Sequence, residues 1–328
     1  MKLKLLKFLV CFSCGRPFKL EVYFKDNEIK EGLLACTKCG KSYPIKNYIP
    51  RILPPQLNKQ TKKTAESFTY EWKNFSNLYN QYKRQFLDWV FPIKPQFFKN
   101  KIILDAGCGV GRHVFHSARF GAKEVIGVDL SNSVDVAYQH VKRLPNVHII
   151  QADIYNLPFK RDFDFIYSIG VLHHLPYPER GFRQLLKYLK ANGKVFAWVY
   201  GREGNKLLRG VLLLRRITTK LPLRLTEALS FLFMVFLFPT IRLIYRPLNN
   251  KKFTKRLAEA LPQNAFFNYL SDFTFKQTHS IIFDQLFAPI ANYYTKEEFS
   301  KWFKNAKLKD IVITQRNNNS WRGFGRLG

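Results

Sequence analysis

Three glycines at alternate positions form the stretch of this chain that is best suited to chemistry. Gly107, Gly109 and Gly111 follow an apolar run that ends in Asp105. Such a run predicts a buried parallel strand, and the residues after the glycines have the pattern of a helix. Glycine at this kind of turn permits a positive φ and leaves no Cβ between a ligand and the backbone. The stretch therefore predicts a ligand-binding turn between a strand and a helix.

Two further acids end apolar runs at the same interval. Asp129 and Asp153 follow Asp105 in steps of 24 residues, as strand–helix repeats would place them. An acid at the end of a second strand can accept hydrogen bonds from both hydroxyls of a ribose. Parallel strands joined by helices bind ligands at their carboxyl ends, so we expect the glycine turn, Asp129, Asp153 and His173 to share one edge of a sheet.

The G-x-G-x-G spacing differs from the G-x-G-x-x-G of nicotinamide dinucleotide sites. It resembles the first motif of the class I S-adenosylmethionine-dependent methyltransferases, of the type 11 kind, and four consecutive motifs match between about residues 101 and 200. The resemblance implies that Asp129 holds the cofactor's ribose, that Asp153 accepts the adenine amino group and that Ile154 packs on the adenine. The alternative is a doubly wound domain with an incidental glycine turn. The cofactor site implied by the resemblance consists of Asp105, Gly107, Cys108, Gly109, Gly111, Asp129, Leu130, Asp153, Ile154 and Ile169.

His173 and His174 are the candidates for catalysis. They follow the fourth predicted strand, in the loop that the resemblance places over the reacting methyl group. In methyl transfer from a sulfonium the cofactor supplies the activation, and the protein aligns the two reactants. A nucleophile that carries a proton needs a base, which a histidine can provide. Alternatively, the pair only shapes the loop or caps the strand. Asp284 and Tyr293 are weaker candidates for the pocket wall.

Two C-x-x-C pairs predict a metal site near the N-terminus. The four thiols are those of Cys11, Cys14, Cys36 and Cys39, and each pair is followed by glycine. Four thiolates can close tetrahedrally on a structural zinc ion. Two disulfides are the alternative, which we favour less because Cys108 is left over and we expect no export signal. The segment resembles the small zinc ribbons that are fused to methyltransferases or partner them.

The expected fold is α/β, with a Rossmann-like seven-stranded methyltransferase sheet, a helical insertion and a small N-terminal zinc ribbon. The expected regions are a zinc ribbon at 1–54, a linker and N-terminal helical lid at 55–100, and a class I methyltransferase domain at 101–328 with a basic, apolar helical insertion at about 201–274. In the second region, Tyr70 or Trp72 either covers the cofactor or packs on the core.

Patterning and capping residues predict several further elements. We expect helices at 113–120, 133–143 and 178–190. Gly193 is expected to cap the last of these, ahead of a fifth strand at 194–200. Thr295 and Glu298 predict a capping box. A final antiparallel strand pair is expected at 309–314 and 320–326.

The charge balance is strongly positive. The chain has 54 Lys and Arg residues against 23 Asp and Glu residues, a net charge of +31. Such a surface attracts nucleic acid or an anionic bilayer, although a general bias toward lysine is the alternative. Residues 201–260 alone carry 13 basic and 3 acidic side chains, a local net charge of +10.

An apolar stretch at 228–241 lies among these cations. Its fourteen uncharged residues are too few to span a bilayer, and we expect no segment of the chain to reach the length of about 18 that a span needs. Flanked by Arg224 and Arg242, the stretch suits an interfacial helix on anionic lipid. A buried helix that caps the substrate pocket is an equal alternative.

The first expectation is thus a methyltransferase for a hydrophobic or membrane-associated small molecule, such as a quinone, lipid or lipid-linked glycan. The second is an RNA methyltransferase, because a zinc ribbon and a basic surface suit a phosphate backbone. Residues 168–171 nevertheless lack an Asn-Pro-Pro-Tyr-like tetrad for amino-group methylation. The third is a non-catalytic module that keeps the cofactor pocket. We expect a cytoplasmic protein, with peripheral binding to the inner membrane face as one option.

Overall fold

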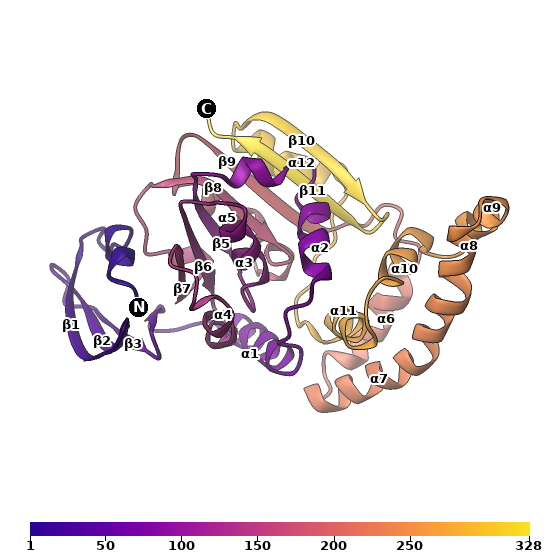
Figure 1. The fold of residues 1–328 in the computed structure, drawn as a ribbon, viewed down its shortest axis with the longest axis horizontal. Coiled ribbons are helices and arrows are strands. Elements are labelled where there is room, and N and C mark those ends of the chain that lie inside the picture. Colours follow the sequence, from indigo (N-terminus) through magenta and orange to yellow (C-terminus); the bar gives the residue numbers. More distant parts are fainter.

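A single mixed sheet of 11 strands runs through the protein, whose computed structural model describes all residues from 1 to 328 (Figure 1). The strand order is β1-β2-β3-β4-β7-β6-β5-β8-β9-β11-β10. The strands are β1 Phe18–Lys25, β2 Ile29–Cys36, β3 Ser42–Lys46, β4 Ile49–Ile52, β5 Ile102–Ala106, β6 Glu124–Asp129, β7 Val147–Ala152, β8 Phe163–Ile169, β9 Leu189–Tyr200, β10 Lys309–Arg316 and β11 Ser320–Arg326. From β7 to β9 the neighbours are parallel, and β11 is antiparallel to both of its neighbours. The seven strands from β7 to β10 confirm the predicted methyltransferase sheet.

Helices cover both faces of this sheet, because alternate strand residues point in opposite directions. One core cluster of 24 buried residues contains Ile103 and lies under α2 (Gln81–Trp89), α3 (Arg112–Arg119) and α4 (Ser133–Val141). A second cluster of 32 buried residues contains Leu104 and lies under α5 (Pro178–Leu186) and α12 (Lys296–Asn305). The central parallel strands are apolar on both faces for this reason.

The predicted helix at 178–190 is too long. α5 ends at Leu186, and β9 begins at Leu189, which pairs with Phe163 of β8. Gly193 therefore lies inside a strand and caps no helix, and Asn192 beside it takes a positive φ of 60°. Sheet pairing decides this boundary, which local propensity had placed later. The capping box at Thr295 and the final strand pair are confirmed.

The N-terminal ribbon extends the main sheet. β4 pairs in parallel with β7, where Arg51 lies opposite Gln151 and Ile52 opposite Ala152. The side chains of Leu5 and Ile29 are buried in the same core cluster as the methyltransferase strands. The ribbon and the α/β domain therefore share one hydrophobic core.

Further helices form the insertion at the right of Figure 1 and the segments that connect it to the sheet. The longer ones are α1 Lys59–Asn74, α6 Leu208–Thr218, α7 Leu223–Thr240, α8 Arg246–Asn250, α9 Lys255–Ala260, α10 Asn264–Leu270 and α11 Phe275–Phe287. Short turns of helix lie at η1 Leu3–Lys7, η2 Pro95–Phe98, η3 Ile154–Asn156, η4 Leu172–His174, η5 Ile241–Tyr245 and η6 Lys252–Thr254. The insertion has its own core cluster of seven buried residues, which includes Met234 and Phe267.

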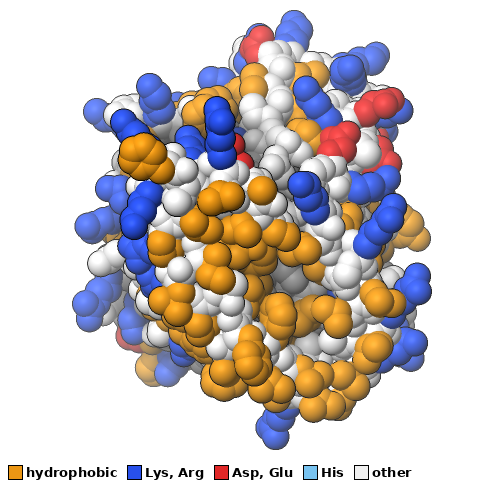
Figure 2. Space-filling model, turned by 90° about the vertical axis from the view of Figure 1, so that its right-hand side faces the viewer, with side chains coloured by type: hydrophobic (Ala, Val, Ile, Leu, Met, Phe, Trp, Pro, Cys, Tyr) orange, Lys and Arg blue, Asp and Glu red, His pale blue; other side chains and the backbone are white.

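One helical stretch, Leu223–Asn250, is long and apolar enough by length and composition to cross a membrane. It has 28 residues because α7 continues through the π-helical turn η5 into α8, beyond Pro239 and Arg242. Our expectation that no segment reaches such a length is therefore wrong. Only 22% of its most apolar window is buried, whereas a core helix would be mostly buried. On this side of the molecule hydrophobic side chains gather around a hollow (Figure 2).

Candidate active site

The glycine turn between β5 and α3 forms one wall of a cavity of about 630 Å³. Gly107, Gly109 and Gly111 have φ values of 92°, 51° and 78°, which favour glycine. A Cβ on Gly107 would collide with the side chain of Val171, and one on Gly109 would lie 3.3 Å from Trp72 Nε1. Backbone conformation and available space both require glycine at this wall.

Asp129 and Asp153 line the same cavity at the ends of β6 and β7. The Asp129 carboxylate accepts hydrogen bonds from Gly109 N at 2.9 Å and from Ser131 N at 2.8 Å, and its burial raises its pKa. Asp153 accepts from Tyr155 N at 3.1 Å and Asn156 Nδ2 at 2.9 Å. Both carboxylates are thus held in place by neighbouring donors, where they could bind ribose and adenine.

Most of the predicted cofactor residues meet at this cavity. Those that line it are Gly107, Cys108, Gly109, Asp129, Leu130, Asp153, Ile154 and Ile169. Asp105 and Gly111 are not part of the lining. Asp105 is fully buried, and burial raises its pKa well above the usual range. Gly111 is the N-cap of α3, and a Cβ on it would lie 3.1 Å from Ala137 Cβ of α4. This glycine therefore permits α3 and α4 to pack closely.

The structure separates the two catalytic candidates. His174 lines the cavity, whereas His173 does not and packs its ring against Tyr200 at 3.9 Å between centroids. His174 Nδ1 lies 2.5 Å from Ile290 O. Because a carbonyl oxygen only accepts, Nδ1 carries the proton, and Nε2 remains an acceptor without a protein partner. Burial lowers the pKa of His174, so its ring is neutral. His173 is fully buried outside the cavity lining, so of the two candidates only His174 is placed beside the space a substrate could enter.

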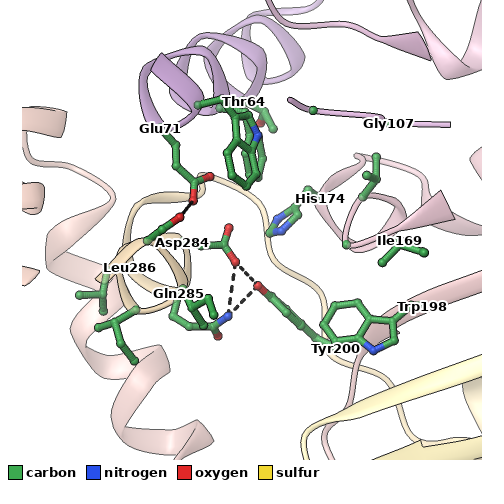
Figure 3. A pocket seen from close by; sticks show the side chains of 18 of the residues that line it. Thr64, Glu71, Gly107, Ile169, His174, Trp198, Tyr200, Asp284, Gln285 and Leu286 are labelled. Carbon is green, nitrogen blue, oxygen red and sulfur yellow. Dashed lines mark hydrogen bonds between the residues drawn. The ribbon is translucent and has the colours of Figure 1, made fainter. Parts of the chain in front are cut away.

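Asp284 lies near His174 and is fixed by two neighbours (Figure 3). Tyr200 Oη and Gln285 Nε2 both donate to Asp284 Oδ2, the second at 3.5 Å, and Gln285 Nε2 also donates to Tyr200 Oη at 2.6 Å. Burial and the Asp284 charge raise the pKa of Tyr200 well above its usual value, so the phenol stays protonated. Tyr293 stacks on Tyr200 at 5.3 Å between centroids. Asp284 and Tyr293 both line the cavity, as expected of a pocket wall.

Glu71 is a site residue that the sequence analysis missed. This α1 side chain is buried and lines the cavity on the same side as Asp284 (Figure 3). Glu71 Oε1 accepts a hydrogen bond from Ser280 Oγ at 3.0 Å, and Oε2 has no partner. Burial and the nearby Asp284 raise its pKa well above the usual value, which favours the protonated carboxyl. An acid between Tyr70 and Trp72 in an aromatic helix was the available signal.

Arg112 is a second missed residue. It follows the glycine turn directly, lines the cavity and stacks its guanidinium on Trp72, Tyr82 and Trp89 at 5.2, 5.0 and 5.3 Å from the ring centroids. A cation at this place could bind the carboxylate of a methionine moiety. Its position immediately after the turn could have identified it from the sequence.

The two aromatic lid candidates differ in position. Trp72 lines the cavity above Gly109, whereas Tyr70 does not and donates a hydrogen bond to Glu227 Oε2 at 2.6 Å. Glu227 belongs to α7. α1 therefore covers the glycine turn with one aromatic side chain and contacts the insertion with the other.

The four N-terminal cysteines form a compact cluster at the far end of the molecule from the insertion (Figure 1). Their sulfur atoms all lie within 4.8 Å of one another, with Cys11 and Cys39 at 3.6 Å and Cys14 and Cys36 at 3.4 Å. Tetrahedral zinc with bonds of about 2.3 Å needs sulfurs about 3.8 Å apart. The thiols are free, so the alternative of two disulfides is not realised. Backbone amides of Cys39 and Lys38 lower the pKa of Cys36 to about 6, which favours a thiolate ligand.

Comparison with known proteins identifies two segments. Residues 104–197 match the family model described as "Methyltransferase domain", and residues 2–47 match "Trm112p-like protein". The second match covers all four clustered cysteines.

Two relatives are named tRNA U34 carboxymethyltransferase. The protein from Pseudoalteromonas atlantica is 32% identical over 114 residues, which is 34% of this chain and 35% of the relative. The protein from Shewanella baltica is 37% identical over 101 residues, 30% of each chain. The chain thus spans about a third of the length of the curated relatives it matches. Among solved structures, a SAM-dependent methyltransferase from Aquifex aeolicus has a TM-score of 0.45 and 12% identity, covering 79% of this chain and 98% of its own.

Both family matches fall on the segments where the glycine turn and the cysteine pairs were found. The sheet order and the cysteine cluster agree with them. The chain therefore contains a class I S-adenosylmethionine-dependent methyltransferase domain and an N-terminal Trm112p-like domain whose four cysteines fit a zinc ribbon.

Proposed function

We propose that the protein methylates a hydrophobic acceptor of the quinone, lipid or lipid-linked glycan type. The observation that carries this proposal is the cavity itself, which connects the glycine turn with an apolar passage between α6 and α7. Of the 48 residues that line it, 26 are hydrophobic. The passage is lined by Leu207, Val211, Leu214, Leu229, Phe233 and Leu237. An apolar acceptor gains free energy by leaving water for such a passage.

The mouth of the passage is identified by lining residues that are also exposed. Leu214, Leu229 and Phe233 line the cavity and have exposed fractions of 53%, 43% and 53%. They come from α6 and α7, so an acceptor can enter between these helices. One cavity therefore includes both the predicted cofactor residues and these exposed residues of the insertion.

The residues at the inner end fit the cofactor. A Cβ on Gly107 or Gly109 would press on Val171 or Trp72, two other side chains of the cavity lining. Asp129, Asp153 and Arg112 supply groups for the ribose, the adenine and the carboxylate. When bound there, S-adenosylmethionine supplies a methyl group activated by a sulfonium. The chain's own contribution is to align the acceptor with that methyl and to exclude water.

Two groups at the meeting point can take the acceptor's proton. His174 Nε2 is a free basic nitrogen, and the Asp284 carboxylate is held by Tyr200. If the acceptor reacted through a hydroxyl group, His174 Nε2 or the Asp284 carboxylate would take the hydroxyl proton. Protonated Glu71 can donate a hydrogen bond to the acceptor or to Asp284.

An RNA acceptor is the second candidate. The curated relatives are named for tRNA, and these names support an RNA acceptor better than a hydrophobic one. The net charge of +31 also suits a phosphate backbone. That similarity covers about a third of each chain. The apolar passage has no role in reading RNA, so we rank this candidate second.

Methyl-labelled S-adenosylmethionine tests both candidates. The protein is incubated with a lysate of its source organism that lacks it, and label is counted in organic, RNA, protein and aqueous fractions, with Asp129→Ala as the inactive control. Label in the organic fraction is the expected result. Label in RNA would establish the second candidate instead, and cofactor binding without label in any fraction would refute catalysis.

A further inference from the structure

The outer face of the insertion is apolar over several helices. Of the 23 large hydrophobic side chains that are exposed in this protein, 16 lie between residues 207 and 257. The exposed fraction is 61% for Leu213, 58% for Leu232, 70% for Phe236, 75% for Leu243 and 100% for Phe253. Monomeric soluble proteins rarely concentrate apolar side chains in this way unless the surface binds something. We call this surface the insertion face.

α7 presents both polar and apolar side chains to the protein, whereas its exposed side chains are mostly apolar. Its buried residues are Thr226, Ser230 and Met234. Thr226 Oγ1 donates a hydrogen bond to Thr218 O at 3.1 Å, and Ser230 Oγ lies 2.8 Å from His279 Nε2. A helix on the surface of a water-soluble protein instead turns its polar residues outward and its apolar stripe toward the core. The exposed stripe of α7 is therefore suited to apolar surroundings.

Cations border the insertion face. Exposed basic side chains stand before α7 at Arg216 and Lys220 and in its first turn at Arg224. Others follow η5 at Arg246, Lys251, Lys252, Lys255 and Arg256. Lys and Arg side chains surround the hydrophobic field in Figure 2. A second copy of the chain would oppose two surfaces with a local net charge of +10 each, so charge complementarity favours an anionic partner.

α7 packs along the protein and is hydrogen-bonded to it near both of its ends. Glu227, near its start, accepts a hydrogen bond from Tyr70 Oη at 2.6 Å. Arg242, just after its end, donates to Phe273 O at 2.9 Å. Crossing a bilayer would require these bonds and the packing against α11 to break. An apolar outer stripe on a helix held in this way suits an interface, with its long axis in the plane of the surface.

We propose that the insertion face docks on an anionic lipid bilayer and that the acceptor enters the cavity directly from that bilayer. The cavity mouth lies within the insertion face, since Leu214, Leu229 and Phe233 belong to both. Docking is inferred from the exposed apolar and basic side chains of the insertion face. The entry route rests on the proposed function, methylation of a hydrophobic acceptor. An acceptor anchored by an apolar tail can then reach the active site without passing through water.

Vesicle flotation tests the docking. The full-length protein is mixed with vesicles of phosphatidylcholine alone or of phosphatidylcholine and phosphatidylglycerol. The apolar variant carries Leu232→Asp, Phe236→Asp and Leu243→Asp, and its control carries Val22→Asp and Phe24→Asp at exposed positions of β1. We expect preferential binding to the anionic vesicles, weakened about tenfold or more in the apolar variant and unchanged in the control.

Circular dichroism verifies that the variants are folded, and light scattering reports their oligomeric state. Equal flotation of the wild-type protein and a folded apolar variant would overturn the docking proposal. A stable dimer that the apolar variant abolishes, without vesicle binding, would also overturn it and assign the face to a second copy. Intact vesicle binding with no label in lipid supports docking and refutes the acceptor route and the proposed function.

Discussion

The reacting end of the cavity is built from side chains that are far apart in the sequence. Glu71, His174 and Asp284 come from α1, η4 and α11, and they line the same cavity as the glycine turn. Their protonation states differ because of burial and neighbours. His174 is neutral and its Nε2 has no protein partner, whereas burial favours the protonated form of Glu71. This set of donors and acceptors can orient an acceptor and remove its proton.

His174→Gln should lower kcat by about 100-fold or more if Nε2 is the base, with cofactor affinity retained. Because burial lowers the pKa of His174 below its ordinary 6.5, the wild-type kcat/KM should fall only at pH values below 6.5. That acid limb should disappear in the variant. Steady-state kinetics across pH measures both effects, and an unchanged acid limb would assign the proton to Asp284 instead.

Gly107→Ala should weaken S-adenosylmethionine binding by about 100-fold, because the new Cβ collides with Val171 at a positive φ. Isothermal titration calorimetry measures the affinity. Gly210→Ala is the matched control, since a Cβ there meets nothing within 4 Å. Equal affinities for the two variants would show that the turn does not hold the cofactor.

Glu71→Gln should stabilise the protein as the pH rises. A carboxyl whose pKa is raised in the folded state contributes stability at low pH, and this contribution is lost as the pH rises from the unfolded value of 4.5 through the folded value. The Tm of the variant should therefore exceed that of the wild-type protein by more at pH 8 than at about pH 5. Differential scanning fluorimetry over this interval gives the comparison. Glu66→Gln, on the exposed side of the same helix, should show no such trend.

At the scale of elements, β4 is the link between the ribbon and the methyltransferase sheet. It pairs with β3 on one side and β7 on the other, so both domains share their hydrogen bonding as well as their core. A small ribbon has too little apolar surface to fold on its own, so a bound metal and this shared sheet are the two supports available to it.

Removing the metal should therefore loosen the ribbon first. We expect one zinc ion per chain, lost in Cys36→Ser and retained in Cys108→Ser, because Cys108 lies outside the cluster. Elemental analysis counts the ion, and hydrogen exchange should show faster exchange in β1–β3 than in β8 and β9 after chelation. A zinc-free wild-type protein with a fully protected ribbon would contradict a structural metal.

At the scale of the whole molecule, the two ends have different tasks. The cysteine cluster lies at one end and the insertion face at the other, with the cofactor edge of the sheet between them (Figure 1). The net charge of +31 attracts the protein to any anionic surface. The apolar side chains of the insertion face stabilise binding only where they enter an apolar phase such as a bilayer.

Salt should separate these two contributions. Raising NaCl from about 0.05 M to 0.5 M shortens the Debye length from about 14 Å to 4 Å, so binding driven by charge alone should be lost. We expect binding to anionic vesicles to weaken but persist, and any binding to RNA to disappear. Flotation and fluorescence anisotropy at both salt concentrations provide the measurement. Complete loss of vesicle binding at high salt would show that apolar insertion contributes little.

The sequence by itself determined the parts whose chemistry depends on residues close together in the chain. A positive φ after a strand requires glycine at 107 and 109, a metal knuckle requires two cysteines three positions apart, and regular strand–helix repeats bring Asp129 and Asp153 to one edge. These constraints are local, so the type and spacing of residues record them.

Only the tertiary structure decided which groups face the substrate. The carbonyl of Ile290, 116 residues away, orients His174, which lines the cavity. The neighbouring His173 is not part of the cavity lining. The end of α5 depended on the pairing of Leu189 with Phe163, and the length of the α7 helix on continuation past Pro239. Burial, pairing and the environment of α7 depend on contacts between distant residues, and spacing along the chain does not encode such contacts.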